Sequence, residues 1–209
     1  MPNTNVGFGL KPISHVDMGT NAYFIDSGAS AIFQGAPVIA TNDGTIARSS
    51  SASGDTLKLL GVFAGCEYVS SVTGKKTFSN YWPGSGANTN FDIIGFVYDN
   101  PAQRFIVCTD GTITDRATAI ATIFENAEFS AESGKGAQDG STTTGISATQ
   151  LDISTVDAAD LSHPLKIVGI LDDEENQDFT AAGIPMIVMI NNHALTAPAT
   201  GGSAEGTVA

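Results

Sequence analysis

The chain has 209 residues, of which 42% are hydrophobic and 15% charged, and its formal net charge at pH 7 is −13. Its nine basic residues include one adjacent pair, Lys75-Lys76, which argues against binding to nucleic acid or to anionic membranes, since both need clustered Lys and Arg. The N-terminus has no basic region followed by an apolar stretch, and no apolar run approaches a membrane span. We therefore expect a chain that folds in a cytoplasm.

In chain order, residues 1–20 predict an N-terminal arm, because Gly7-Phe8-Gly9-Leu10 sets apolar side chains between glycines. Short β-rich segments then follow, separated by turn residues such as Asn42-Asp43-Gly44. Strands are expected at residues 22–25, 31–33, 38–40, 59–69, 76–82, 91–98, 104–108, 147–153, 165–171 and 185–191.

The segment 57–82 carries the strongest hairpin signal, since Thr73-Gly74-Lys75 separates two β-rich runs. Its block of two apolar residues, a glycine and two more apolar residues recurs twice, at 59–63, 93–97 and 167–171. Glycine inside a strand marks a bulge, a bend or a close backbone approach, which predicts a curved sheet that closes or nearly closes. The alternative is three ordinary buried strands with incidental glycines.

One helix is expected at Thr114 to Asn126, with Thr114 or Asp115 as its N-cap, and residues 157–161 are a candidate for a single helical turn. Residues 130–144 and 172–178 are expected to be loops. The pattern therefore predicts a mainly β fold: an antiparallel β-barrel or sandwich-like core at 21–195 with at most one or two short helices. This core lies between an extended arm at 1–20 and a flexible tail at 196–209.

The residues that carry chemistry do not form a recognisable set. His15, His163 and His193 have no second histidine or cysteine at metal-ligand spacing, and no nucleophile elbow, phosphate loop or dinucleotide motif is present. We therefore expect no catalytic residues, no cofactor and no enzyme activity. Cys66 and Cys108 lie in apolar strands, so buried free thiols are expected, with a disulfide between them as the alternative.

The acidic stretch at 172–178 is the best candidate for a metal site, because alternate oxygen ligands suit Ca²⁺. However, Gln177 stands where such a loop needs glycine, and Gly183 stands where it needs a bidentate glutamate. We therefore expect a solvated loop and no metal.

Four residues are candidates for an interface with a partner protein or with a second copy: Phe8, Leu10, Tyr81 and Trp82. Aromatic anchors are enriched at interfaces, but Trp82 can equally pack in the core with its indole N–H bonded to the backbone. For Phe8 and Leu10 a partner surface is favoured, because a glycine-flanked arm has little core of its own to join.

An ordered series of motifs gives the chain a family resemblance over residues 7–195. The motifs are GFGLKPISHVDMG, the pattern IFxGxPV at 32–38, LLGVFAGCEY, YWPG, GFVYDNPAQRFIV, LKIVGILD and MIVMINNHAL. Together they resemble the auxiliary head proteins, also called decoration or cement proteins, of tailed bacteriophages, especially phages of aquatic bacteria.

This resemblance implies a virion structural protein that binds the outer surface of an icosahedral capsid and cements neighbouring major capsid subunits, stabilising the expanded, DNA-filled head. It implies the major capsid protein as partner and a homo-oligomer, with a trimer favoured and a dimer as alternative. The protein would lie on the capsid exterior of the virion, and in the host cytoplasm during assembly. A tail or baseplate structural protein of the same phages is the alternative function.

Overall fold

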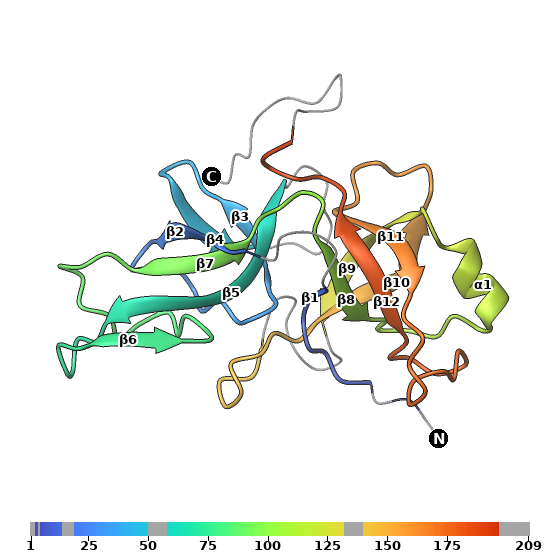
Figure 1. Ribbon diagram of the computed structural model, residues 1–209, viewed down its shortest axis with the longest axis horizontal. Helices are drawn as coiled ribbons and strands as arrows, with labels where there is room; N and C mark the ends of the chain where they lie inside the picture. The colour runs from blue at the N-terminus through green and yellow to red at the C-terminus, as the bar shows by residue number, and fades with distance from the viewer. Residues whose placement is uncertain (1–2, 4, 14–18, 50–57, 132–139, 197–209) are drawn as a thin grey trace.

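The computed structural model describes residues 3, 5–13, 19–49, 58–131 and 140–196, and it is mainly β, as expected (Figure 1). Two lobes lie side by side, each built on one six-stranded sheet. The first lobe contains β2 (Asn21–Ile25), β3 (Pro37–Ala40), β4 (Thr45–Arg48), β5 (Leu59–Val69), β6 (Lys76–Ser79) and β7 (Ile94–Tyr98). The second contains β1 (Lys11–Ile13), β8 (Arg104–Cys108), α1 (Arg116–Ala121), β9 (Asn126–Ala131), β10 (Thr149–Asp157), β11 (Leu165–Ile170) and β12 (Pro185–Ile190).

The first lobe is a closed five-stranded barrel. Its hydrogen-bonded order is β3-β4-β2-β7-β5, and β3 pairs in turn with β5, which completes the ring. All these pairings are antiparallel except that of β2 with β4. β6 pairs with β5 outside the ring and is an edge strand. Closure removes the free edges that an open sheet of these five strands would present.

Two of the three repeated glycine blocks build this barrel. A Cβ at Gly61 in β5 would lie 2.3 Å from the carbonyl oxygen of Tyr98, so glycine permits a close approach between β5 and the end of β7. A Cβ at Gly95 in β7 would meet side-chain atoms of the barrel interior at 2.9–3.0 Å. The expectation of a closing sheet is confirmed for these two strands. Gly169 belongs to the other lobe, where it lies at a bulge in the pairing of β11 with β12.

The second lobe is nearly closed. Its order is β1-β8-β12-β11-β9-β10. An isolated bridge links Thr109, directly after β8, to Leu151 of β10, so the run of strands from β8 to β10 comes back on itself. The Asp110 N–H also donates to the Leu151 carbonyl at 3.0 Å. β1 extends the sheet beyond β8, with Lys11 opposite Ile106. The arm expected at 1–20 therefore contributes a strand to its own chain.

The helix is shorter than the sequence predicts. Asp115 is its N-cap, as expected, and its side chain accepts a hydrogen bond from the Thr118 N–H. The helix ends at Ala121, and Phe124 adopts a positive φ of 79° that a helix cannot contain. Asn126, expected as the last helical residue, begins β9. The run of β-branched residues before Phe124 favours this early ending.

The two lobes share strands at their junction. Val38 of β3 and Phe63 of β5 point into the core of the first lobe, whereas Ile39 and Val62 belong to the core of the second. The segment after β12 returns to the first lobe, where the Asn192 carbonyl accepts a hydrogen bond from the Leu59 N–H of β5 at 2.9 Å. Successive side chains along β3 and β5 point to opposite faces, so this one pair of strands contributes side chains to the cores of both lobes.

Several local expectations differ from the structure. Residues 31–33 form no strand, and Ile32 makes only an isolated bridge to Trp82. Residues 157–161 contain bends and turns, with no helical turn. Strands β1, β4 and β9 were not expected. His15, most of loop 130–144 and the tail after 196 lie outside the described residues. Within the described part of the chain, no helix is long and apolar enough to cross a membrane.

Candidate functional site

Trp82 is a core residue, which corrects its assignment as an interface candidate. Its side chain is 0% exposed, and the indole N–H donates to the Ala29 carbonyl at 3.1 Å. The ring meets that of Tyr68 edge-on, with centroids 5.5 Å apart. The indole N–H therefore has its partner inside the chain, as expected when Trp packs in a core.

Leu10 is also buried within its own chain. It is 1% exposed, joins the second lobe's core, and its N–H donates to the Gly35 carbonyl at 2.9 Å. The prediction of a partner surface for Leu10 is therefore wrong. Leu10 can be buried because the neighbouring glycine lets the backbone pack closely. A Cβ at Gly9 would lie 2.7 Å from the Gly35 carbonyl oxygen, and Gly9 has a φ of +73°. These glycines permit close packing against the core.

The other two candidates keep some exposure. Tyr81 is half-buried, and its ring stacks on that of Phe33 with centroids 5.5 Å apart and an interplanar angle of 5°. Phe8 is half-buried and lines a groove between the lobes. The structure thus brings Phe8 and Leu10 to one groove and places Tyr81 and Trp82 elsewhere, in the first lobe.

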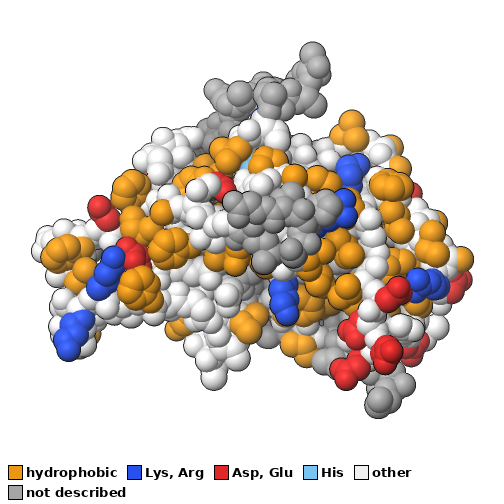
Figure 2. Space-filling model, viewed as in Figure 1, with side chains coloured by type: hydrophobic (Ala, Val, Ile, Leu, Met, Phe, Trp, Pro, Cys, Tyr) orange, Lys and Arg blue, Asp and Glu red, His pale blue; other side chains and the backbone are white. Residues whose placement is uncertain are grey.

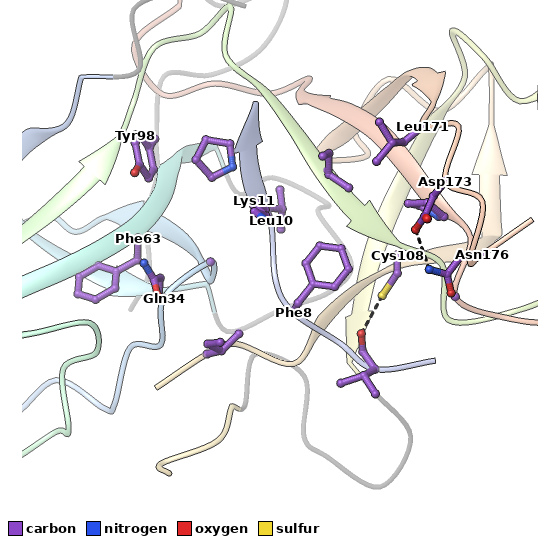
Figure 3. Close-up of a pocket in the computed structure, with 17 residues that line it drawn as sticks. Phe8, Leu10, Lys11, Gln34, Phe63, Tyr98, Cys108, Leu171, Asp173 and Asn176 are labelled. Carbon is purple, nitrogen blue, oxygen red and sulfur yellow. Dashed lines mark hydrogen bonds between the residues drawn. The ribbon is translucent and has the colours of Figure 1, made fainter. Parts of the chain in front are cut away.

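The groove between the lobes has a volume of about 560 Å³ (Figure 3). Val6 and Phe8 of the arm line it, together with Leu171, which follows β11, and Pro185, the first residue of β12. Apolar residues predominate in this lining. Asp173 is one of its polar groups, and the carboxylate accepts a hydrogen bond from the Asn176 amide at 2.7 Å (Figure 3). A groove of this size and lining is suited to apolar side chains or a small apolar ligand.

A second apolar surface covers the outside of the first lobe. Phe24 of β2 lies opposite Ile94 of β7, which lies opposite Glu67 of β5, so the three side chains share the outer face. Phe96 is two residues further along β7 on the same face. Phe24 and Phe91 are both more than half exposed and line one shallow hollow. We call Phe24, Phe91, Ile94 and Phe96 the apolar face. In Figure 2, hydrophobic side chains gather over this lobe beside an acidic and a basic group.

The hairpin of β5 and β6 adds two strongly exposed apolar residues. Val72 in the turn is 89% exposed, and Phe78 in the edge strand β6 is 69% exposed. Lys76 pairs with Glu67 at 2.7 Å, and its ammonium lies 5.5 Å from the Phe78 ring centroid. The sequence predicts this hairpin, but its exposed apolar tip was not predicted. The signal for the tip was a phenylalanine in a short strand next to two lysines.

The two histidines within the described residues, His163 and His193, are both largely buried. His163 lies 3.2 Å from the Asp160 carboxylate and 3.7 Å from that of Glu128. Burial lowers the pKa of His193 below its ordinary value. Within the described residues no group of three His, Cys, Asp or Glu side chains could hold a metal, and Asp173 of the acidic loop lies at the groove.

Cys66 and Cys108 are buried free thiols, as expected. Cys66 donates to the Tyr81 carbonyl at 3.4 Å, and burial raises its pKa to about 12. Cys108 lies in the groove wall, where its thiol donates to the Val6 carbonyl at 3.2 Å and accepts from the Gln150 amide at 3.3 Å. These contacts assign both thiols to packing.

Comparison with known protein families, curated proteins and solved structures finds no match to this chain.

Proposed function

We propose that this chain is a virion structural protein that binds the outer surface of an icosahedral capsid and cements neighbouring major capsid subunits. The proposal starts from the motif series over residues 7–195 that resembles bacteriophage decoration proteins. Its partners are the major capsid protein and further copies of itself, and its place is the exterior of the virion.

The apolar face of the first lobe is the structural observation that carries this proposal. Large exposed apolar patches on a protein surface mark interaction sites, since burying them in a partner releases ordered water. Phe24 and Phe91 flank a hollow whose polar residues include Asp26 and Asp92. Such aromatic anchors surrounded by polar residues are typical of protein–protein interfaces.

The closed barrel suits a cementing role mechanically. A ring of five hydrogen-bonded strands has no free edge, so each strand of the ring is held by hydrogen bonds to two neighbours. Many weak contacts per shell add up through multivalency, and so each copy needs only a modest interface.

The test is to mix the purified protein with expanded capsids that lack it and to image them by cryo-electron microscopy. We expect added density on the outer surface at capsomer junctions. Phe24→Ser combined with Phe91→Ser should remove this density. Leu161→Ser, which changes an exposed apolar residue of the second lobe, is the matched control and should leave the density unchanged. Bare capsids with the unchanged protein would contradict the proposal and favour the tail or baseplate alternative.

A further inference from the structure

The β5–β6 hairpin projects from the first lobe and carries an apolar tip with two positive charges. We call residues 70–78 the hairpin tip. Val72 and Phe78 are its large exposed apolar residues, and Lys75 and Lys76 lie between them. Lys75 is exposed in the turn, and Lys76 keeps more than half of its side chain exposed although it pairs with Glu67. Exposure of these apolar side chains to water is unfavourable, and burying them against a partner protein would relieve it.

The groove between the lobes is a matching apolar recess. Val6 and Ile146 in its lining are 50% and 38% exposed, although both are large apolar residues. Phe8 and Leu171 complete an apolar lining within about 560 Å³. This volume falls within the range of protein binding pockets and admits side chains of the size of valine and phenylalanine.

Charge distinguishes the two surfaces. The loop between β11 and β12 lies at the groove and carries Asp173, Glu174 and Glu175. The neighbouring Asp172 is already paired with Arg116 at 3.0 Å. In the lining itself Lys11 and Asp173 balance each other, and the negative excess comes from Glu174 and Glu175, which follow Asp173 in the loop at the groove's edge. Figure 2 shows acidic side chains gathered at one end of the molecule beside a basic group, with further basic side chains over the middle and at the opposite end.

We propose that the hairpin tip of one copy docks in the groove of a second copy. Val72 and Phe78 then cover the apolar lining around Val6 and Ile146, and Lys75 approaches the acidic loop. Complementary potentials favour this pairing, whereas two hairpin tips side by side would place their lysine pairs together and repel. The contact joins two different surfaces, so successive copies form a closed ring or an open chain.

This inference rests on the proposed function only in that it names the two surfaces through which copies of a virion structural protein would assemble with one another. It does not require the capsid. Tip and groove lie on different parts of each copy, so both can be engaged in a ring. Phe78 lies opposite Glu67, on the same outer face as Ile94, so the tip contact borders the apolar face of the first lobe.

The test uses sedimentation velocity and light scattering on the full chain over a series of concentrations. We expect the unchanged protein to self-associate. Lys75→Glu with Lys76→Glu, and separately Glu174→Lys with Glu175→Lys, should each weaken association at least about tenfold, because like charges then meet. An equimolar mixture of the two variants should regain association, since each reversed surface meets its complement on the other.

Lys166→Glu is the control for a change in charge alone, because Lys166 lies at the opposite end of β11 from Leu171. It should leave association unchanged. Circular dichroism and thermal melting of every variant separate lost assembly from lost folding. Monomeric unchanged protein at all concentrations would overturn the inference, as would association that survives both charge reversals or fails to return in the mixture.

The same variants separate this inference from the proposed function. A monomeric protein that still decorates capsids would overturn the tip-in-groove contact and leave the capsid role standing. Charge-dependent self-association without any capsid density would support the contact and count against the capsid role.

Discussion

The N-terminal arm and the β5–β6 hairpin tip both combine glycine with large apolar residues, yet the structure places them in opposite environments. In the arm, a Cβ at Gly7 would lie 2.4 Å from the Ala148 carbonyl oxygen, and Leu10 is buried. In the hairpin, a Cβ at Gly74 would meet nothing within 4 Å, and Val72 points into solvent. The same residue types thus serve close packing in one region and a projecting turn in the other.

The largest expected effect comes from the base of the hairpin, which is core although the tip is exposed. Trp82→Ala should lower the free energy of unfolding by about 3–5 kcal/mol, because it removes a fully buried indole and its hydrogen bond. Urea denaturation followed by circular dichroism measures this. A loss below about 1 kcal/mol would show that Trp82 is dispensable for folding and would reopen its assignment to an interface.

Leu10→Ala tests whether the arm belongs to the core. We expect a loss of about 2–5 kcal/mol in the free energy of unfolding, because the leucine leaves a cavity at the junction of the lobes. The comparison is with Val6→Ala in the same arm, which changes a half-exposed residue and should cost much less. Equal, small effects of the two substitutions in denaturant titration would mean that the arm is not docked in solution.

Gly7→Ala asks whether close packing requires this glycine. The three atoms nearest to the added methyl would be backbone atoms of Ala148, and backbone cannot rotate away as a flexible side chain does. We expect a destabilisation of about 1–3 kcal/mol, the usual cost of overpacking. Thermal melting gives the stability, and faster hydrogen exchange at Leu10 would locate the damage in the arm.

Gly74→Ala is the counterpart in the hairpin. The space around Gly74 is open, so the only cost is its φ of +65°, which other residues adopt with about 1–2 kcal/mol of strain. We expect a destabilisation at the lower end of this range, seen as a small drop in melting temperature. An effect larger than that of Gly7→Ala would reverse the distinction between the two regions.

Phe78→Ser should have the smallest effect on stability, within about 0.5 kcal/mol, because the side chain is mostly in solvent. It should nevertheless weaken self-association if the hairpin tip docks in the groove. Melting and sedimentation of the same preparation give both quantities. Strong destabilisation with unchanged association would show that Phe78 acts only within its own lobe.

Much of the sheet content was predictable, because period-two alternation and turn residues are local signals. The strand at Arg104–Cys108 has the bounds that the sequence predicts, and the turn around Gly74 is where the pattern places it. Thr45–Arg48 was missed because four residues after a turn carry little periodicity. The helix was predicted too long, since alanine content outweighed the β-branched residues before Phe124.

The candidate site was less predictable, because exposure depends on partners distant in sequence. Nothing near Leu10 indicates that its N–H will bond to Gly35 or that the next three residues will pair with β8. Glycine beside an apolar residue fits both a mobile arm and a closely packed one. The sequence likewise left open whether Trp82 lies in the core or at an interface. The hydrogen bond from its indole N–H to the Ala29 carbonyl places it in the core. The groove combines residues from the arm, the barrel and the β11–β12 loop, which no sequence window contains.

The pairing of β1 with β8 also sets an order of events during synthesis. The arm is made before β8, and Lys11 has no strand partner until Arg104–Cys108 follows it. The Leu59 N–H likewise waits for Asn192, near the end of the described chain. Such distant contacts slow folding, because their loop-closure entropy is lost before they form. The first lobe can close its barrel early, and the seam between the lobes is completed last.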